Sequence, residues 1–116
     1  MAFDDLVAAT RSAVASRQRS APLRELRERT RSVPTARNVA SVLRAPGRVV
    51  SVIAEVKRAT ATFADLSGVG DVAVLARFYE AGGAACVSVV TEPVRSHGRL
   101  SDLDAVRGAV EVPVLA

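Results

Sequence analysis

The fold is decided by residues 49–58, which read Val-Val-Ser-Val-Ile-Ala-Glu-Val-Lys-Arg. The run up to Val56 is nearly continuous, apolar and β-branched, which is typical of a strand buried on both faces. Because side chains alternate across a strand, Glu55 and Lys57 share one face with Ile53. The other face is wholly apolar, should pack on helices, and consists of Val50, Val52, Ala54 and Val56. The stretch therefore predicts a buried strand with a carboxylate and an ammonium together at its carboxyl end.

Downstream of this strand, helix and strand patterns alternate, with loops over residues 59–70 and 93–98. We expect, in order, a helix capped by Asp71 and ended by Gly82-Gly83, a strand over residues 85–91, a helix opened by a capping box of Ser101 and Asp104, and a strand from Val112 to Leu115. Strands that alternate with helices imply a parallel sheet with right-handed crossovers. Residues 49–116 are therefore predicted to be an α/β domain with three parallel strands and two helices.

Residues 1–48 follow a different pattern and are predicted to form an N-terminal helical extension. Apolar residues from Phe3 to Val14 recur at helical spacing, and Pro22 is expected in the first turn of a second helix. Thr35 is the predicted cap of a short third helix, which ends at Ala45-Pro46-Gly47.

The two parts differ in charge. Residues 1–48 hold ten arginines and four acids, which gives +6, whereas residues 49–116 hold six bases and eight acids, which gives −2. A basic segment can bind nucleic acid or another anion. Here the arginines are spread along helices with no aromatic side chains between them, which favours a solvated helical surface with some bias toward anionic ligands, and no nucleic-acid partner.

Composition limits the class of protein. The chain has 116 residues, of which 49% are hydrophobic and 24% charged, so it is globular and not disordered. No apolar run approaches the roughly 20 residues that span a membrane, and residues 1–5 carry acids where a signal peptide carries bases. The single cysteine, Cys86, lies in an apolar run and is expected to be a small buried side chain in a reducing compartment. These features predict a cytoplasmic protein.

Lys57 is the one lysine among sixteen basic residues. A genome that favours arginine codons would explain the count, but the position points to a site, because ligands bind at the carboxyl ends of strands in parallel sheets. Lysine differs from arginine in offering a compact ammonium suited to proton transfer. With Glu55, it could bind an anion and move protons. The alternative is a structural ion pair in the core.

The other candidate positions carry weaker signals. Glu92 ends the second strand on the face of Ser88 and Val90, although a rim charge in a solvated loop is the stronger reading for this residue taken by itself. His97 stands alone, so no metal site is predicted. The segment 67–70 has two glycines but lacks the full pattern of a dinucleotide-binding loop, and a flexible loop is expected there.

Several blocks together resemble the indole-3-glycerol-phosphate synthase family. They cover residues 49–116 in the family's order and are Val52–Ala59, Tyr79–Ala84, Ser88–Glu92, Leu103–Arg107 and Val112–Leu115. The resemblance implies a (β/α)8 TIM barrel that closes an indole ring on 1-(2-carboxyphenylamino)-1-deoxyribulose 5-phosphate, with loss of carbon dioxide and water, in tryptophan biosynthesis. It implies that Glu55 and Lys57 are the catalytic pair of the first strand, that Thr60 and Glu92 bind substrate, and that no metal or cofactor is needed.

The chain departs from the family in two loops. Thr60-Ala61-Thr62 and Phe63-Ala64 stand where the family usually writes Ser-Pro-Ser and Lys-Gly. Ser96 stands where the family usually has a phenylalanine, so an aromatic wall for the anthranilate ring is missing.

The resemblance also stops at the third strand, before the family's Lys-Asp-Phe segment and the later strands with further catalytic and phosphate-binding groups. We therefore expect an incomplete barrel that is inactive by itself and self-associates through its open sheet edges. The alternative is a non-catalytic half-barrel interaction module that a partner chain completes.

Overall fold

The computed structural model describes residues 3–47, 50–60, 68 and 70–116. By packing, the chain forms two compact units, Met1–Thr35 and Ala36–Ala116, and each is described here by itself. The division at residue 48 that the sequence suggests stays a proposal about domain organisation. None of the described helices is long and apolar enough to cross a membrane.

The first unit consists of two helices, α1 (Phe3–Ser20) and α2 (Leu23–Thr30). Pro22 occupies the cap position of α2 with φ −60°, close to its expected place at the helix start. An ion pair joins Arg29 to Glu25 one turn away. Neither helix contains a buried residue, and the apolar side chains of Phe3 and Leu23 are exposed.

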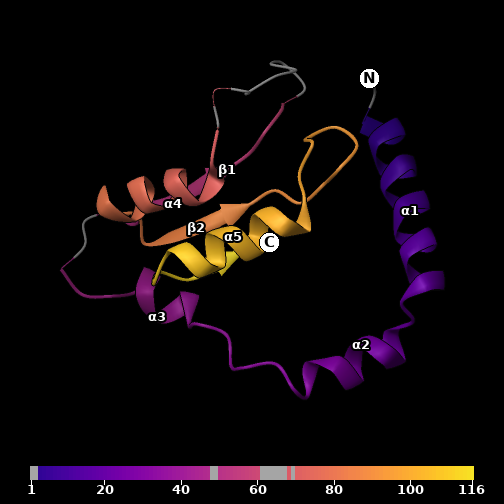
Figure 1. Ribbon diagram of the computed structural model, residues 1–116, viewed down its shortest axis with the longest axis horizontal. Coiled ribbons are helices and arrows are strands. Elements are labelled where there is room, and N and C mark those ends of the chain that lie inside the picture. The colour runs from indigo at the N-terminus through magenta and orange to yellow at the C-terminus, as the bar shows by residue number, and fades with distance from the viewer. Residues whose placement is uncertain (1–2, 48–49, 61–67, 69) are drawn as a thin grey trace. The chain divides into compact units, whose positions relative to one another are not determined.

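The second unit is built around a three-stranded parallel sheet (Figure 1). Its strands β1 (Ile53–Val56), β2 (Cys86–Val89) and β3 (Val114–Leu115) lie in the order β1-β2-β3. Helix α4 (Val72–Ala81) connects β1 to β2, and α5 (Leu100–Ala109) connects β2 to β3, while the short α3 (Val39–Leu43) precedes β1. The predicted β-α-β-α-β order and the parallel sheet are confirmed.

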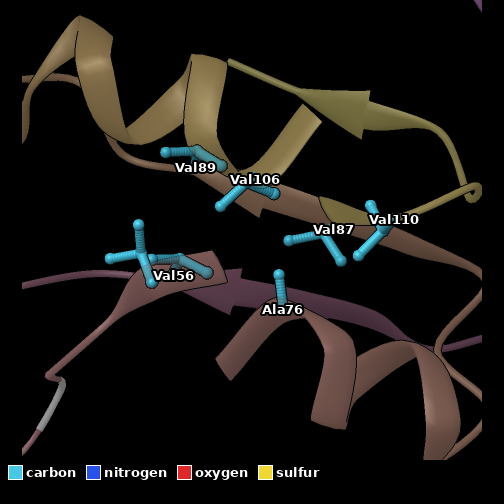
Figure 2. Close-up of a cluster of buried hydrophobic side chains, with 7 residues drawn as sticks. Val56, Ala76, Val87, Val89, Val106 and Val110 are labelled. Carbon is cyan, nitrogen blue, oxygen red and sulfur yellow. The ribbon is translucent and has the colours of Figure 1, made fainter. Parts of the chain in front are cut away.

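The core lies between the sheet and the helices α4 and α5 (Figure 2). Figure 2 shows Ala76 of α4 and Val106 of α5 directed toward Val87 of β2. Val56 of β1 and Val89 of β2 are also fully buried there. Each buried valine stabilises the fold by about 1.5–3 kcal/mol, so this small set carries the packing. Both helices therefore cover the face of the sheet to which Val56, Val87 and Val89 belong.

The first strand is shorter and more exposed than predicted. It begins at Ile53, and residues Val52 and Ile53 are 53% and 45% exposed. Within the described residues β1 pairs with β2 alone, so its second edge and part of its surface remain open to solvent. The prediction of a strand buried on both faces is wrong for these residues, and Val49 lies outside the described residues.

The predicted ends of α4 are confirmed. The Asp71 side chain accepts hydrogen bonds from the backbone N–H groups of Ala73, at 2.8 Å, and Val74, at 3.4 Å. The helix ends at Ala81 with Gly82 as its cap, and Gly83 follows with φ +93°, a conformation that favours glycine. Local sequence signals therefore set both ends of the helix between β1 and β2.

Two predicted helix caps are wrong. Helix α5 begins at Leu100, so Ser101 and Asp104 lie within it, and the cap residue is Arg99, whose side chain makes no capping bond. Helix α3 is capped by Asn38 and not by Thr35, since Asn38 Oδ1 accepts a hydrogen bond from Ser41 N at 3.0 Å. In both places the helix begins at a residue other than the one chosen from side-chain preference.

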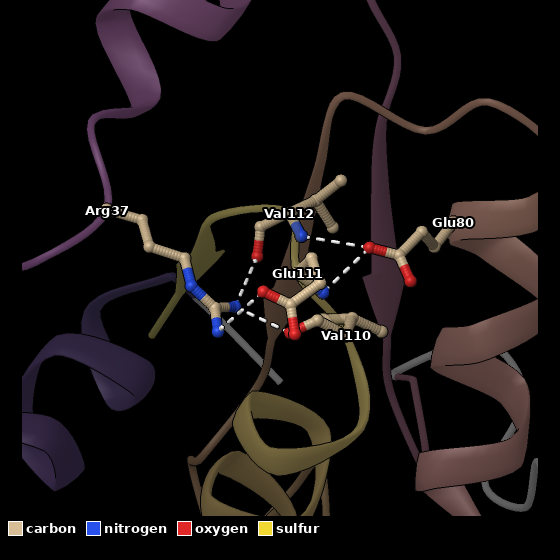
Figure 3. A network of polar contacts seen from close by, with 5 residues as sticks. All are labelled: Arg37, Glu80, Val110, Glu111 and Val112. Atoms are coloured by element: carbon tan, nitrogen blue, oxygen red, sulfur yellow. Dashed lines mark hydrogen bonds and ion pairs between the residues drawn. The ribbon is translucent and has the colours of Figure 1, made fainter.

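The turn between α5 and β3 is held from two sides at the amino end of the sheet (Figure 3). Arg37 Nη1 donates to the carbonyl oxygens of Val110, at 2.6 Å, and Val112, at 3.0 Å. Glu80 Oε1 accepts from the backbone N–H groups of Glu111, at 2.8 Å, and Val112, at 2.9 Å. We call this arrangement of Arg37 and Glu80 around residues 110–112 the amino-end clamp.

Candidate active site at the carboxyl end of the sheet

Glu55 and Lys57 meet where β1 ends. Glu55 Oε1 lies 3.3 Å from Lys57 Nζ, so the two side chains project on the same side of the strand, as the alternation predicts. Their side chains are 48% and 33% exposed. The alternative of an ion pair enclosed in the core does not fit these exposures. The pair is therefore partly solvated.

The same face continues across the sheet. Glu55 is in register with Ser88 of β2, and Ser88 is in register with Leu115 of β3. Because neighbours in register point to the same side of a sheet, these three residues form a row on the face opposite Val87 and its helices. In a parallel βα architecture with all helices on one face, the other face lines the interior of the barrel.

Tyr79 supports the backbone of the site. Its hydroxyl donates to the carbonyl oxygen of Glu55 at 3.2 Å. The carbonyls of Val52 and Val56 accept from Ala85 N and Val90 N toward β2. Since backbone groups alternate in direction along a strand, the Glu55 carbonyl points away from β2, to the open edge of β1. Tyr79 therefore satisfies an acceptor that β2 cannot reach.

Arg58 and Asp102 form an ion pair that was not predicted from the sequence. Arg58 Nε donates to Asp102 Oδ2 at 2.8 Å, and Arg58 Nη2 donates to Asp102 Oδ1 at 2.7 Å. The side chains are only 24% and 8% exposed. The residues are far apart in the chain, and the one available signal was an arginine directly after Lys57 and an acid in the first turn of the second βα helix.

The Arg58 hydrogen bonds set the ionisation of this pair. They lower the pKa of the Asp102 carboxyl below its ordinary value; burial opposes the shift, and the positive charges of Arg58 and Arg99 add to it. The same hydrogen bonds raise the pKa of Arg58. Both groups are therefore charged near neutral pH, and the pair is a bidentate, charge-assisted contact.

Glu92 organises the loop that follows β2. Its carboxylate accepts hydrogen bonds from the backbone N–H groups of Val94 and Arg95, each at 2.8 Å, and of Ser96 at 2.9 Å. Burial raises the pKa of the Glu92 carboxyl, but these hydrogen bonds and the charge of Arg95 outweigh it and leave the pKa below its ordinary value. Glu92 thus fixes residues 94–96 beside the end of the strand.

The far end of this loop returns to the strand at Gly98. A Cβ atom built there would lie 2.1 Å from the carbonyl oxygen of Val90, so only glycine fits. Next to it, His97 has φ +51°, a left-handed conformation that is uncommon for residues other than glycine. The loop is therefore tied to β2 at both of its ends.

The remaining predicted positions are placed as follows. Thr60 is half-buried just beyond β1, and Ser96 is half-buried in the Glu92 loop. The departures at residues 61–64 and the serine of the segment 67–70 lie outside the described residues. Cys86 is buried as expected, and burial raises the pKa of its thiol, which makes it a poor nucleophile. Among the described residues no group of His, Cys, Asp and Glu could hold a metal ion.

A three-stranded parallel sheet whose strands are joined by helices, with ionisable side chains at its carboxyl end, has the architecture of part of a (β/α)8 barrel. The family model for indole-3-glycerol phosphate synthase matches residues 3–116. The chain belongs to this family.

Curated relatives agree with the family assignment. Indole-3-glycerol phosphate synthases of Mycolicibacterium smegmatis and Mycolicibacterium gilvum are each 46% identical over 113 residues, which are 97% of this chain and 41% of the relative. That of Parafrankia sp. is 46% identical over 114 residues, 98% of this chain and 42% of the relative. The chain thus spans about two fifths of the length of the relatives it matches.

Proposed function

We propose that this chain supplies the first strands of an indole-3-glycerol-phosphate synthase barrel, a carbon–carbon lyase of tryptophan biosynthesis. The reaction closes an indole ring on 1-(2-carboxyphenylamino)-1-deoxyribulose 5-phosphate and releases carbon dioxide and water. One observation carries the proposal. In a chain of this family, a carboxylate and the single lysine lie 3.3 Å apart, partly solvated, at the carboxyl end of a parallel strand.

Glu55 and Lys57 take complementary parts in the proposed chemistry. The Lys57 ammonium is a cation next to which the substrate carboxylate can bind before it leaves as carbon dioxide. Glu55, in contact with that ammonium, is placed to pass protons during ring closure. Because the ion pair is partly open to solvent, the Lys57 ammonium can exchange the Glu55 carboxylate for a substrate anion at a small cost in free energy. An ion pair enclosed in a dry core could not do so.

Thr60 and Glu92 are proposed to bind substrate at the same end of the sheet. Thr60 carries a hydroxyl just beyond the catalytic strand. Glu92 already accepts three backbone hydrogen bonds, so its contribution to binding comes largely through the loop it holds at residues 94–96. In this proposal the protein acts in the cytoplasm and needs no metal, cofactor or nucleic acid.

A complementation assay tests the proposal. The chain is mixed with a second chain carrying the remaining barrel strands of the Mycolicibacterium smegmatis relative, and indole-3-glycerol phosphate formation is followed by fluorescence. We expect turnover only in the mixture. In the Glu55→Gln and Lys57→Met chains it should fall at least about 100-fold, the usual loss for a proton-transfer group. Arg107→Gln, an exposed change on α5, is the matched control and should retain turnover.

A second function is favoured by the open edge of β1 and by Ser96. The exposed Val52 and Ile53 border a strand edge that can pair with another chain, and Ser96 supplies no aromatic wall for a substrate ring. This function is a non-catalytic half-barrel module that associates with a partner or with itself. A stable complex with no product in the complementation assay would support it over the enzyme.

A further inference from the structure

We propose that the Arg58–Asp102 ion pair is a positioning device for Lys57, through which helix α5 holds the site lysine beside Glu55. The inference rests on the function proposed above for Glu55 and Lys57. Arg58 contacts Asp102 of α5, a helix packed on the face of the sheet opposite Glu55, so the two are positioning residues and not catalytic ones.

The first step concerns where the sheet stops supporting the chain. Strand β1 ends at Val56, whose carbonyl accepts from Val90 N at 3.0 Å. Lys57 lies just beyond this bond. The next contact along the chain is the bidentate bond of Arg58. Lys57 thus lies between two fixed points, one made by the sheet and one made by Arg58.

The second step concerns direction. Lys57 reaches Glu55 on the interior face, while Arg58 reaches Asp102 in the first turn of α5. A guanidinium bound through two parallel hydrogen bonds is fixed in orientation as well as in distance. Fixing the Arg58 side chain on one side of the backbone limits rotation of the preceding residue, and so keeps the Lys57 side chain on the other side.

The third step concerns stability, because a buried ion pair such as Arg58–Asp102 is better explained by a role in fixing geometry than by a gain in folding free energy. Asp102 is the only buried charged residue in the part of the chain that the structure describes. Buried ion pairs contribute little net stability compared with apolar side chains, but they can specify one geometry. The anchor is also firm. Asp102 N donates to Arg99 O at 3.1 Å, and α5 is fixed to the sheet by the fully buried Val106.

The single lysine makes the inference directly measurable. With lysine labelled at Cε with ¹³C, the chain gives one side-chain NMR signal, that of Lys57. Replacing Glu55 by glutamine removes the charge next to the ammonium, so the change in the Lys57 signal on Glu55→Gln measures the contact. This change is recorded in three backgrounds, namely the parent chain, Asp102→Asn and Glu80→Gln.

Glu80→Gln is the matched control, because Glu80 also accepts two hydrogen bonds but lies in the amino-end clamp. We expect the Glu55→Gln change to persist in the parent and Glu80→Gln chains and to fall at least twofold in Asp102→Asn. An equal change in all three folded chains would overturn the inference. If Asp102→Asn does not fold, Asp102→Glu replaces it, since it keeps the negative charge but alters the bidentate geometry with Arg58. Asp102→Glu should also reduce the effect of Glu55→Gln on the Lys57 signal.

The NMR result and the complementation assay fail separately. Suppose that the parent mixture shows no turnover while the effect of Glu55→Gln on the Lys57 signal still depends on Asp102. That result would refute the proposed function and leave the positioning intact. If the mixture does show turnover but the effect of Glu55→Gln on the Lys57 signal is the same with and without Asp102, the positioning alone is refuted.

Discussion

Gly98 and Glu92 determine the shape of the loop at the mouth of the site. Glu92 binds the N–H groups of residues 94–96, and the N–H of Gly98 donates to the Glu92 carbonyl at 2.9 Å. One residue thus contacts the loop through both its side chain and its backbone. The close approach of Gly98 to Val90 leaves no room for adjustment, so single changes here should have large effects.

Gly98→Ala should lower the free energy of unfolding by about 3 kcal/mol, because the added methyl group meets the Val90 backbone and not a flexible side chain. Gly108→Ala is the control. It lies in α5 with open space around it, and it should raise the free energy of unfolding by about 0.5–1 kcal/mol through helix propensity. Urea unfolding followed by circular dichroism measures both. Equal effects of the two changes would contradict the close approach at Gly98.

Acid should destabilise the second unit through Glu92 and Asp102. Both carboxyls have a folded pKa below the ordinary value of about 4. The stability they contribute is therefore present above that value and is lost as the pH falls through the lower, folded pKa. We expect the free energy of unfolding to fall steeply below about pH 4.

Glu92→Gln should make this acid dependence shallower, because an amide does not titrate. It should also cost about 1–2 kcal/mol at pH 7, since charge-assisted hydrogen bonds are lost. Urea unfolding at pH 7 and pH 3.5 compares the two chains. Parallel pH profiles would show that the Glu92 carboxylate does not stabilise its loop.

The helices differ in how their first turns are satisfied. Helix α4 has Asp71 as a side-chain cap, whereas α5 begins after Arg99, whose side chain makes no capping hydrogen bond. The beginning of α5 is held instead by the contact of Asp102 with Arg58. Tertiary contacts thus replace a local cap in the second helix.

Asp71→Ala should lower the free energy of unfolding by about 1 kcal/mol through loss of the α4 cap. Arg99→Ser should raise it by about 0.5–1 kcal/mol, because a serine hydroxyl can accept from the first turn of α5. Differential scanning calorimetry measures the two shifts in Tm. A lower Tm for Arg99→Ser would show that this position does not cap the helix.

The order of the helices and strands and the Glu55–Lys57 pair could be predicted from the sequence, because both depend on local patterns. Alternation along β1 placed Glu55 beside Lys57, and Asp71 with Gly83 marked the ends of α4. The exposure of β1 was not accessible, because a hydrophobic run does not say how many neighbours a strand has. The Arg58–Asp102 pair was missed because its partners are 44 residues apart and no local pattern joins them.

At the scale of the whole second unit, the two faces of the sheet differ. Helices α4 and α5 cover the side of Val87, whereas the row from Glu55 to Leu115 lies on the opposite face, away from this core, in the part of the chain that the structure describes. Strand β1 is an edge in the described sheet, and the Tyr79 hydroxyl occupies its outward carbonyl at Glu55. A chain that adds to this edge would compete with that hydroxyl for the Glu55 carbonyl.

Tyr79→Phe should therefore promote self-association, since it leaves the Glu55 carbonyl free to accept from another strand. Sedimentation velocity over a range of concentrations should show a larger fraction of dimers or higher species than in the parent chain. Phe78→Tyr, a change at the exposed neighbouring position on α4, is the control and should leave the distribution unchanged. Identical distributions for the parent and Tyr79→Phe would indicate that this edge does not associate.

The amino-end clamp has a consequence for how the sequence can diverge. Arg37 and Glu80 form hydrogen bonds with the backbone of residues 110–112, so these bonds do not depend on which side chains that turn carries (Figure 3). The clamp also lies at the end of the sheet opposite Glu55 and Lys57. Substitutions can therefore accumulate around the mouth, as at Ser96, while the far end keeps the βα units joined.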